Sequence, residues 1–139
     1  MNWTLVALLA IPGLMMGLLS VKGHTRGIEP YLWLVLALFA TIVIARTAAE
    51  RYFLHGLSVG IAWGLLNGIV ATALFPIYAQ NNPEVMQQMQ SGGSKLAPQA
   101  IFLLTAPLIG LATGLVIGFL CWGASYVITP APPVAGING

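Results

Sequence analysis

The chain has 139 residues, of which 58% are hydrophobic and 6% are charged, with five basic and three acidic side chains. An average soluble domain carries roughly 25% charged residues, and the mean hydropathy here is +0.90, so most of this surface is suited to hydrocarbon. A net charge of +2 supplies too few cations to neutralise a phosphate backbone, so we expect no nucleic-acid partner.

Four apolar segments are each long enough to cross a hydrocarbon core of about 30 Å as an α-helix, with the backbone hydrogen-bonded internally. They cover residues 3–21, 31–49, 53–79 and 98–129. The first lacks a preceding basic stretch and a cleavage site before Lys22, so we expect a retained helix, bent near Pro12. The sequence therefore predicts one all-α domain over residues 1–129, an integral membrane bundle of four transmembrane helices.

Two segments lie outside these apolar helices. Residues 80–97 are rich in Asn and Gln, and Asn82-Pro83-Glu84 predicts the start of a short helix within them. Residues 130–139 form a Pro-rich C-terminal tail whose composition excludes a regular helix. Basic side chains are almost balanced between the two membrane sides, so the polar third loop decides the orientation, and we expect both termini in the cytoplasm.

Small residues recur every four positions in the third and fourth apolar segments. The first series is Gly56, Gly60, Gly64 and Gly68, and the second is Ala106, Gly110, Gly114 and Gly118. Residues four apart lie on nearly one face of a helix, where a missing side chain lets another backbone approach closely. Two interpretations stay open: the two helices pack against each other, or they pack against another subunit or around an oligomeric axis.

Few side chains are suited to catalysis. Ser58 lies in a G-x-S-x-G sequence directly after His55. The nucleophile elbow with that pattern needs a strand–turn–helix context and a carboxylate partner, whereas this motif lies in an apolar helix and the chain has no Asp. We therefore expect no catalytic residue, and we interpret Ser58 as a hydrogen-bonding partner for a neighbouring helix.

His55 and Asn67 are the candidate binding residues of the apolar segments. His55 is a candidate axial ligand for a haem or chlorophyll-type pigment, and the alternative is an ordinary hydrogen-bonded histidine near the interface. Asn67 is predicted to make a polar contact between helices, or else a contact to a pore or ligand. Two histidines with no Asp and one Cys do not make a usual metal site, so no metal or cofactor is predicted, only bound lipid.

Three stretches carry a resemblance to known proteins: residues 50–56 (ERYFLHG), 78–84 (YAQNNPE) and 106–110 (APLIG). Over about its last two thirds, the chain resembles uncharacterised small bacterial four-helix membrane proteins that are classed only as domains of unknown function. The resemblance implies a protein of the bacterial inner membrane with an Asn-Pro-Glu loop after the third helix. It implies no activity and no catalytic residues.

The leading functional hypothesis is a non-catalytic accessory subunit that scaffolds a larger membrane complex. Its expected partners are membrane lipids and either other membrane subunits or further copies of the chain. A small oligomeric channel or transporter is the alternative, with the glycine stripes at a symmetry axis and Asn67 near the pore. A membrane enzyme that uses Ser58 or His55 is the third hypothesis.

Overall fold

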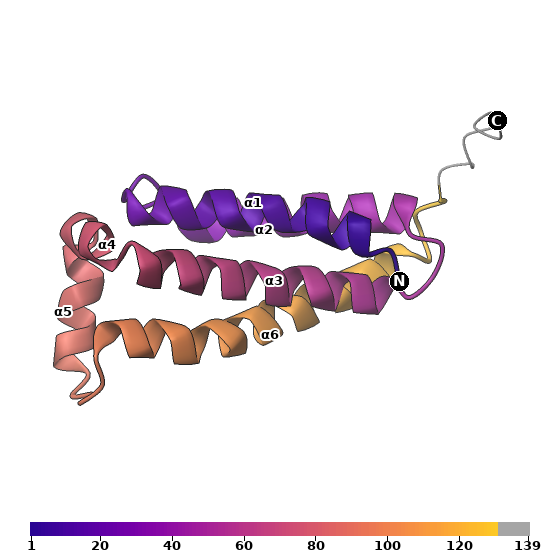
Figure 1. Ribbon diagram of the computed structural model, residues 1–139. Coiled ribbons are helices and arrows are strands. Elements are labelled where there is room, and N and C mark those ends of the chain that lie inside the picture. The colour runs from indigo at the N-terminus through magenta and orange to yellow at the C-terminus, as the bar shows by residue number, and fades with distance from the viewer. Residues whose placement is uncertain (131–139) are drawn as a thin grey trace.

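The computed structural model describes residues 1–130, and every regular element within them is an α-helix (Figure 1). The helices are α1 (Trp3–Val21), α2 (Glu29–Thr47), α3 (Tyr52–Ala73), α4 (Phe75–Asn81), α5 (Pro83–Ser91) and α6 (Pro98–Ala124). Four of them, α1, α2, α3 and α6, are long and apolar enough to cross a membrane. The predicted all-α membrane bundle is therefore confirmed, while the predicted tail lies, beyond Pro130, outside the described residues.

The third apolar segment is not one helix. It was expected to run over residues 53–79, but α3 ends at Ala73 and α4 begins at Phe75 after an interruption at Leu74. Pro76 explains the interruption, because proline has no N–H to donate to the carbonyl four residues earlier and its ring crowds that turn. The chain turns there, and α4 and α5 fold over one end of the bundle (Figure 1).

Two other predicted boundaries are also wrong. The fourth apolar segment, expected over residues 98–129, is helical only to Ala124, because the N–H groups of Tyr126 and Val127 reach back three residues instead of four. The second, expected over residues 31–49, begins two residues earlier at Glu29 and ends at Thr47. The earlier start matters below, because it makes Glu29 part of the first turn of α2.

The loop helix α5 begins at Pro83, as the sequence predicts. The side chain of Asn82, however, does not cap it. Its amide Nδ2 instead donates to the backbone oxygens of Ser20 and Tyr78, each at 3.0 Å. The residue therefore fastens the α4–α5 corner to the end of α1.

Helix α3 lies at the centre of the bundle, between α1 and α6, and α2 packs beside α1 against both α3 and α6 (Figure 1). One end of the bundle carries Trp3, Thr47, Tyr52 and Ala124, and we call it the closed end. The other carries Val21, Glu29, Ala73 and Pro98 together with α4 and α5, and we call it the open end.

Helices α3 and α6 run antiparallel with their backbones in contact. A Cβ atom added to Gly56 would lie 2.8 Å from the Gly118 Cα, which is closer than real Cβ contacts come. Further along the contact, a Cβ on Gly60 or Gly64 would overlap backbone atoms of the glycine opposite it. This contact therefore requires the absence of side chains at these positions.

The contact between α1 and α3 is built around one large side chain. Trp63 is 1% exposed, and its indole N–H donates to the Leu9 carbonyl at 2.7 Å. Leu9 lies in the turn that Pro12 perturbs, where the proline removes one backbone donor from the helix. A Cβ on Gly13 would overlap the Trp63 ring, so the glycine makes room for it. Helix α1 is continuous through Pro12, and the indole adds a donor where the helix has lost one.

The two halves of α2 are packed differently. Its buried residues are Ala37, Ala40, Thr41, Ile44 and Ala45, all in the half that leads to the closed end. There they meet α3 and α6 in a core that includes Val59, Ile117 and Cys121, each 0% exposed. No residue of α2 before Ala37 is buried, so a space is left between this half of α2 and the rest of the bundle.

Candidate functional site

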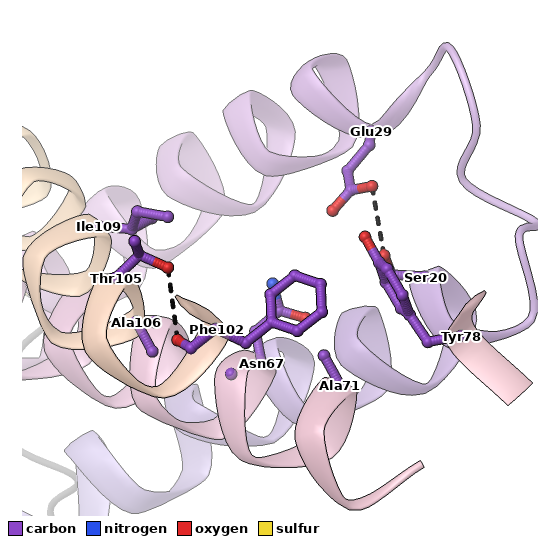
Figure 2. Close-up of a pocket in the computed structure, with 11 residues that line it drawn as sticks. Ser20, Glu29, Asn67, Ala71, Tyr78, Phe102, Thr105, Ala106 and Ile109 are labelled. Atoms are coloured by element: carbon purple, nitrogen blue, oxygen red, sulfur yellow. Dashed lines mark hydrogen bonds between the residues drawn. The ribbon is translucent and has the colours of Figure 1, made fainter. Parts of the chain in front are cut away.

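Two adjoining cavities occupy the space beside the first half of α2, and we call them together the cleft. Their volumes are about 200 and about 350 Å³. Glu29, Gly64, Asn67 and Ile109 line both of them. Helices α2, α3 and α6 contribute these walls, and Ser20 and Tyr78 close the smaller cavity at the open end (Figure 2). The larger cavity reaches Trp63, which is at the middle of α3.

Glu29 is the acidic side chain of the cleft. Its Oε2 accepts hydrogen bonds from the hydroxyls of Ser20, at 3.4 Å, and Thr25, at 3.1 Å. Its Oε1 accepts from the indole N–H of Trp33 at 3.3 Å. Figure 2 shows the carboxylate directed towards Ser20 and Tyr78 from the first turn of α2. Three neutral donors therefore hold the carboxylate, and they leave its charge uncompensated.

Tyr78 of α4 forms part of the wall at the open end. It is 8% exposed, and its ring packs edge-on against Phe102 of α6 with the centroids 5.0 Å apart. Burial raises the pKa of the Tyr78 phenol above its usual 10.0, and the nearby charge of Glu29 raises it further. Both effects favour the neutral phenol, which keeps its O–H donor at the mouth of the cleft.

The deep part of the cleft is aromatic. Trp33 of α2 and Trp63 of α3 both line the larger cavity, with ring centroids 5.5 Å apart and planes tilted by 46°. Each indole N–H already has a protein acceptor, Glu29 for Trp33 and the Leu9 carbonyl for Trp63. Neither indole therefore offers its N–H to the cavity, and since Trp63 is only 1% exposed, the ring surface available there is mainly that of Trp33.

Asn67 was predicted to make a polar contact between helices. It lines both cavities, and its Oδ1 lies near α1, where a Cβ added to Gly17 would come within 3.2 Å of it. Within residues 1–130 its side chain makes no hydrogen bond. The amide therefore lies at the α1–α3 contact and keeps its hydrogen-bonding capacity for whatever occupies the cleft.

The small residues predicted to pack are brought together at one place. The structure places Gly56 opposite Gly118, Gly60 opposite Gly114, Gly64 opposite Gly110 and Gly68 opposite Ala106. Both stripes are thus used within the chain, between α3 and α6. The same backbone surfaces are not free to line a symmetry axis.

His55, the candidate pigment ligand, lies at the closed end and is 2% exposed. Its Nε2 accepts from the backbone N–H of Asn2 at 2.9 Å, and its Nδ1 lies 3.0 Å from the Arg51 carbonyl. An acceptor Nε2 requires the proton on Nδ1, so both ring nitrogens are occupied. His55 therefore holds the N-terminus against α3 and has no nitrogen left for a haem or pigment.

The remaining reactive side chains are not assembled into a site. Ser58 makes no hydrogen bond to His55 in the described part of the chain, because both nitrogens of that histidine are bonded elsewhere. Cys121 is buried in the core of the closed end. Among residues 1–130, no group of three or more His, Cys, Asp or Glu side chains is arranged to hold a metal ion.

Comparison of the chain with protein-family models, with curated proteins and with solved structures finds no match. The resemblance to small bacterial four-helix membrane proteins therefore stays a prediction. The function has to be argued from the cleft itself.

Several residues of the cleft were not singled out from the sequence. Glu29 was counted only among the charges, although it is an acid within the first turn of an apolar helix. Neither Trp33 nor Trp63 was considered as a binding residue. The sequence signal for Trp63 was its position within the glycine series of α3, together with the Pro12-Gly13 pair in α1. Only the folded bundle shows that Trp63 and Gly13 meet.

Proposed function

We propose that the chain is a small membrane transporter whose solute binds in the cleft. The observation that carries this proposal is the depth of the cleft, from Glu29 at the open end to Trp63 at the middle of α3. A recess that contains a carboxylate and extends halfway through a membrane bundle is typical of a solute pathway. Of the functions that the sequence left open, transport is the one that uses these side chains.

The closed end supports a transporter in preference to a passive pore. Ile44, Val59 and Ile117 are each fully buried there, between the deep end of the cleft and the other membrane face. A binding site near the midplane with a packed core between it and one membrane face is the arrangement expected for alternating access. Helix α2 would be the moving element, since its buried residues all lie from Ala37 onward and its first half is at most partly buried.

Flux into proteoliposomes tests this proposal. We expect the purified chain to take up at least one class of small solute, and we expect Ile109→Trp, which fills the cleft, to abolish the uptake. Ile69→Trp is the matched control, because Ile69 is a similarly exposed isoleucine of α3 that does not line the cleft. The proposal is overturned if the folded protein moves none of a panel of amines, amino acids, sugars and ions.

An accessory role in a larger membrane complex is the second candidate, and a feature of α6 favours it. The outer face of α6 carries an exposed apolar seam at a spacing of three and four residues: Leu104, Leu108, Leu111, Leu115 and Phe119. Such spacing is typical of a helix that packs against another helix. Lipid, another membrane subunit or a second copy of the chain would cover this seam.

Extraction of native membranes in a mild detergent separates the two candidates. A large particle with other proteins in fixed stoichiometry supports the accessory role. A small homogeneous particle supports the transporter. The same preparation, analysed by mass spectrometry, identifies any bound lipid.

We also propose that the chain lies in a bacterial inner membrane with both termini in the cytoplasm. The polar third loop and the α4–α5 corner, at the open end, support this orientation. The mouth of the cleft then faces outward. We expect a reporter that is active only in the cytoplasm to be active when fused after Gly139. A signal from a periplasmic reporter at the same position would mean that the orientation is the reverse.

The proposed role is non-catalytic. The support is that Ser58 and His55 form no dyad in the described chain. Any hydrolytic activity found in the purified protein would be assayed in a Ser58→Ala, His55→Ala double variant. Activity that disappears in this variant, while the variant stays folded, would contradict the proposed role.

A further inference from the structure

We propose that the cleft binds a small alkylated ammonium ion, held between the Glu29 carboxylate and the ring of Trp33, against which Trp63 packs. This proposal names the solute class for the transport proposed above and rests on that transport for its biological role. The binding itself rests on the geometry of the cleft and is measured separately.

The first step of the argument is charge. Arg26, three residues before Glu29, donates to the Asn81 carbonyl at the surface. The Nε of Arg51 lies 3.4 Å from the Oε1 of Glu50, and both side chains are exposed at the closed end. In residues 1–130 no basic side chain forms an ion pair with Glu29, and the other residues that line the cleft are neutral. A carboxylate in a recess of low dielectric favours a cation as its partner.

The second step is the nature of the walls. Because the indole N–H of Trp33 is bonded to Glu29, the partly buried Trp33 ring offers apolar ring surface to the cavity and no donor, and the buried Trp63 ring packs against it. A cation within about 6 Å of an indole ring is attracted by the negative face of that ring. Carboxylate and aromatic surface together are the chemistry that recognises alkylated ammonium groups.

The third step excludes a bare metal ion among the candidate cations. Ca²⁺ takes about six to eight oxygen ligands, and Mg²⁺ requires near-octahedral oxygen coordination. The cleft has one carboxylate, and the described chain has no cluster of three metal-ligating side chains. An alkylated ammonium ion needs one counter-charge and apolar walls, which the cleft supplies.

The fourth step concerns size and the rest of the ligand. The larger cavity, of about 350 Å³, lies within the range of roughly 300–1,000 Å³ that small-molecule sites occupy. Asn67 and Thr113 line it, and neither side chain is hydrogen-bonded within residues 1–130. They suit a hydroxyl or carbonyl on the same ligand.

Equilibrium binding of radiolabelled choline to the full-length chain in detergent is the direct test. Choline carries a trimethylated ammonium and a hydroxyl, and 3,3-dimethylbutan-1-ol is its neutral isostere. We expect saturable binding of choline and no competition by the isostere. Competition by the isostere as effective as that by unlabelled choline, or no saturable choline binding by the folded chain, would overturn the proposal.

Three variants locate the site. Glu29→Gln keeps the size of the side chain and one acceptor oxygen while removing the charge, and we expect it to weaken choline binding at least about tenfold. Trp33→Leu is expected to weaken binding about threefold or more, while Trp33→Phe retains most of it. Glu84→Gln is the matched control, because it removes the same charge from α5, outside the cleft, and we expect no change.

The outcomes separate this proposal from the transport function. Choline binding that depends on Glu29, with no flux in proteoliposomes, supports the site and rejects transport. Flux of another solute, with no choline binding, supports transport and rejects the ammonium site. Choline binding that is unchanged in a folded Glu29→Gln variant rejects the site; if that variant does not fold, the comparison with the isostere in the unmodified chain decides.

Discussion

The two ends of the bundle differ in how α2 packs against α3 and α6. At the closed end, α2, α3 and α6 share an apolar core, and His55 bonds the N-terminus to α3. At the open end, the first half of α2 contributes no buried residue, and polar side chains line a recess. The comparison teaches that the apolar core and the cleft are separated along the length of the bundle. Substitutions near the closed end should cost stability, and those at the open end should chiefly change what the chain binds.

The largest loss of stability is expected when a side chain is placed between α3 and α6. Gly60→Leu would overlap the Gly114 backbone, so the two helices must move apart, and we expect a loss of more than about 3 kcal/mol of stability. Unfolding by titration with SDS measures it. Gly123→Leu is the control, because an added Cβ there meets no atom within 4 Å. Equal stability of the two variants would show that the α3–α6 contact is not as close as described.

A second substitution tests the boundary between the two ends. Trp63→Phe removes the hydrogen bond to Leu9 and leaves space in the core, and we expect a loss of about 2 kcal/mol. Trp122→Phe, at a tryptophan that is 52% exposed, should be close to neutral. The melting temperature of both variants in the same detergent provides the comparison. An unchanged melting temperature of the Trp63→Phe variant would show that the indole hydrogen bond to Leu9 does not stabilise α1.

A third substitution tests the attachment of the N-terminus. His55→Ala leaves the Asn2 N–H without its acceptor, and we expect a loss of about 1–2 kcal/mol. Hydrogen exchange of the first turn of α1 should accelerate more than exchange in α6. His24→Ala, at an exposed histidine in the α1–α2 loop, serves as the control. Unchanged exchange at Asn2 would argue against the bond to His55.

The smallest expected effect is at the open end and depends on pH. Because the pKa of Tyr78 is raised in the folded chain, the unfolded chain releases this proton first, and folding is disfavoured as the pH rises above about 10. Above this pH, we expect the melting temperature of the Tyr78→Phe variant to fall slightly less steeply than that of the unmodified chain. Tyr31→Phe, at a tyrosine that is 70% exposed, should leave the fall unchanged. A Tyr78→Phe curve that superimposes on the original would mean that Tyr78 is not buried in solution.

Composition and segment length were sufficient to predict four membrane-spanning helices, because hydrocarbon leaves few other solutions for the backbone. The interruption at Leu74 was also within reach, since Pro76 lies inside the third apolar segment and disfavours a continuous helix there. It was missed because hydropathy was weighed above the proline. Hydropathy does not register hydrogen bonding, and here the missing donor decided the boundary.

The cleft was not within reach of sequence reasoning. Glu29 lines it only because the first half of α2 stands away from the bundle while Ser20 and Thr25 of preceding segments supply donors. That geometry depends on where α2 meets α6, which no local pattern specifies. The two tryptophans likewise come from helices whose mutual placement is set by glycines elsewhere in the chain.

The central position of α3 also bears on how the protein is made. Helix α1 has its main partner in α3, which is synthesised after α2, and α3 has its closest partner in α6, which is synthesised last. Insertion from the N-terminus therefore delivers α1 and α2 into lipid before either has its main contacts. A chain arrested before α6 would display the glycine face of α3 to the membrane. Membrane quality control would then be able to recognise an incompletely synthesised chain by this exposed glycine face.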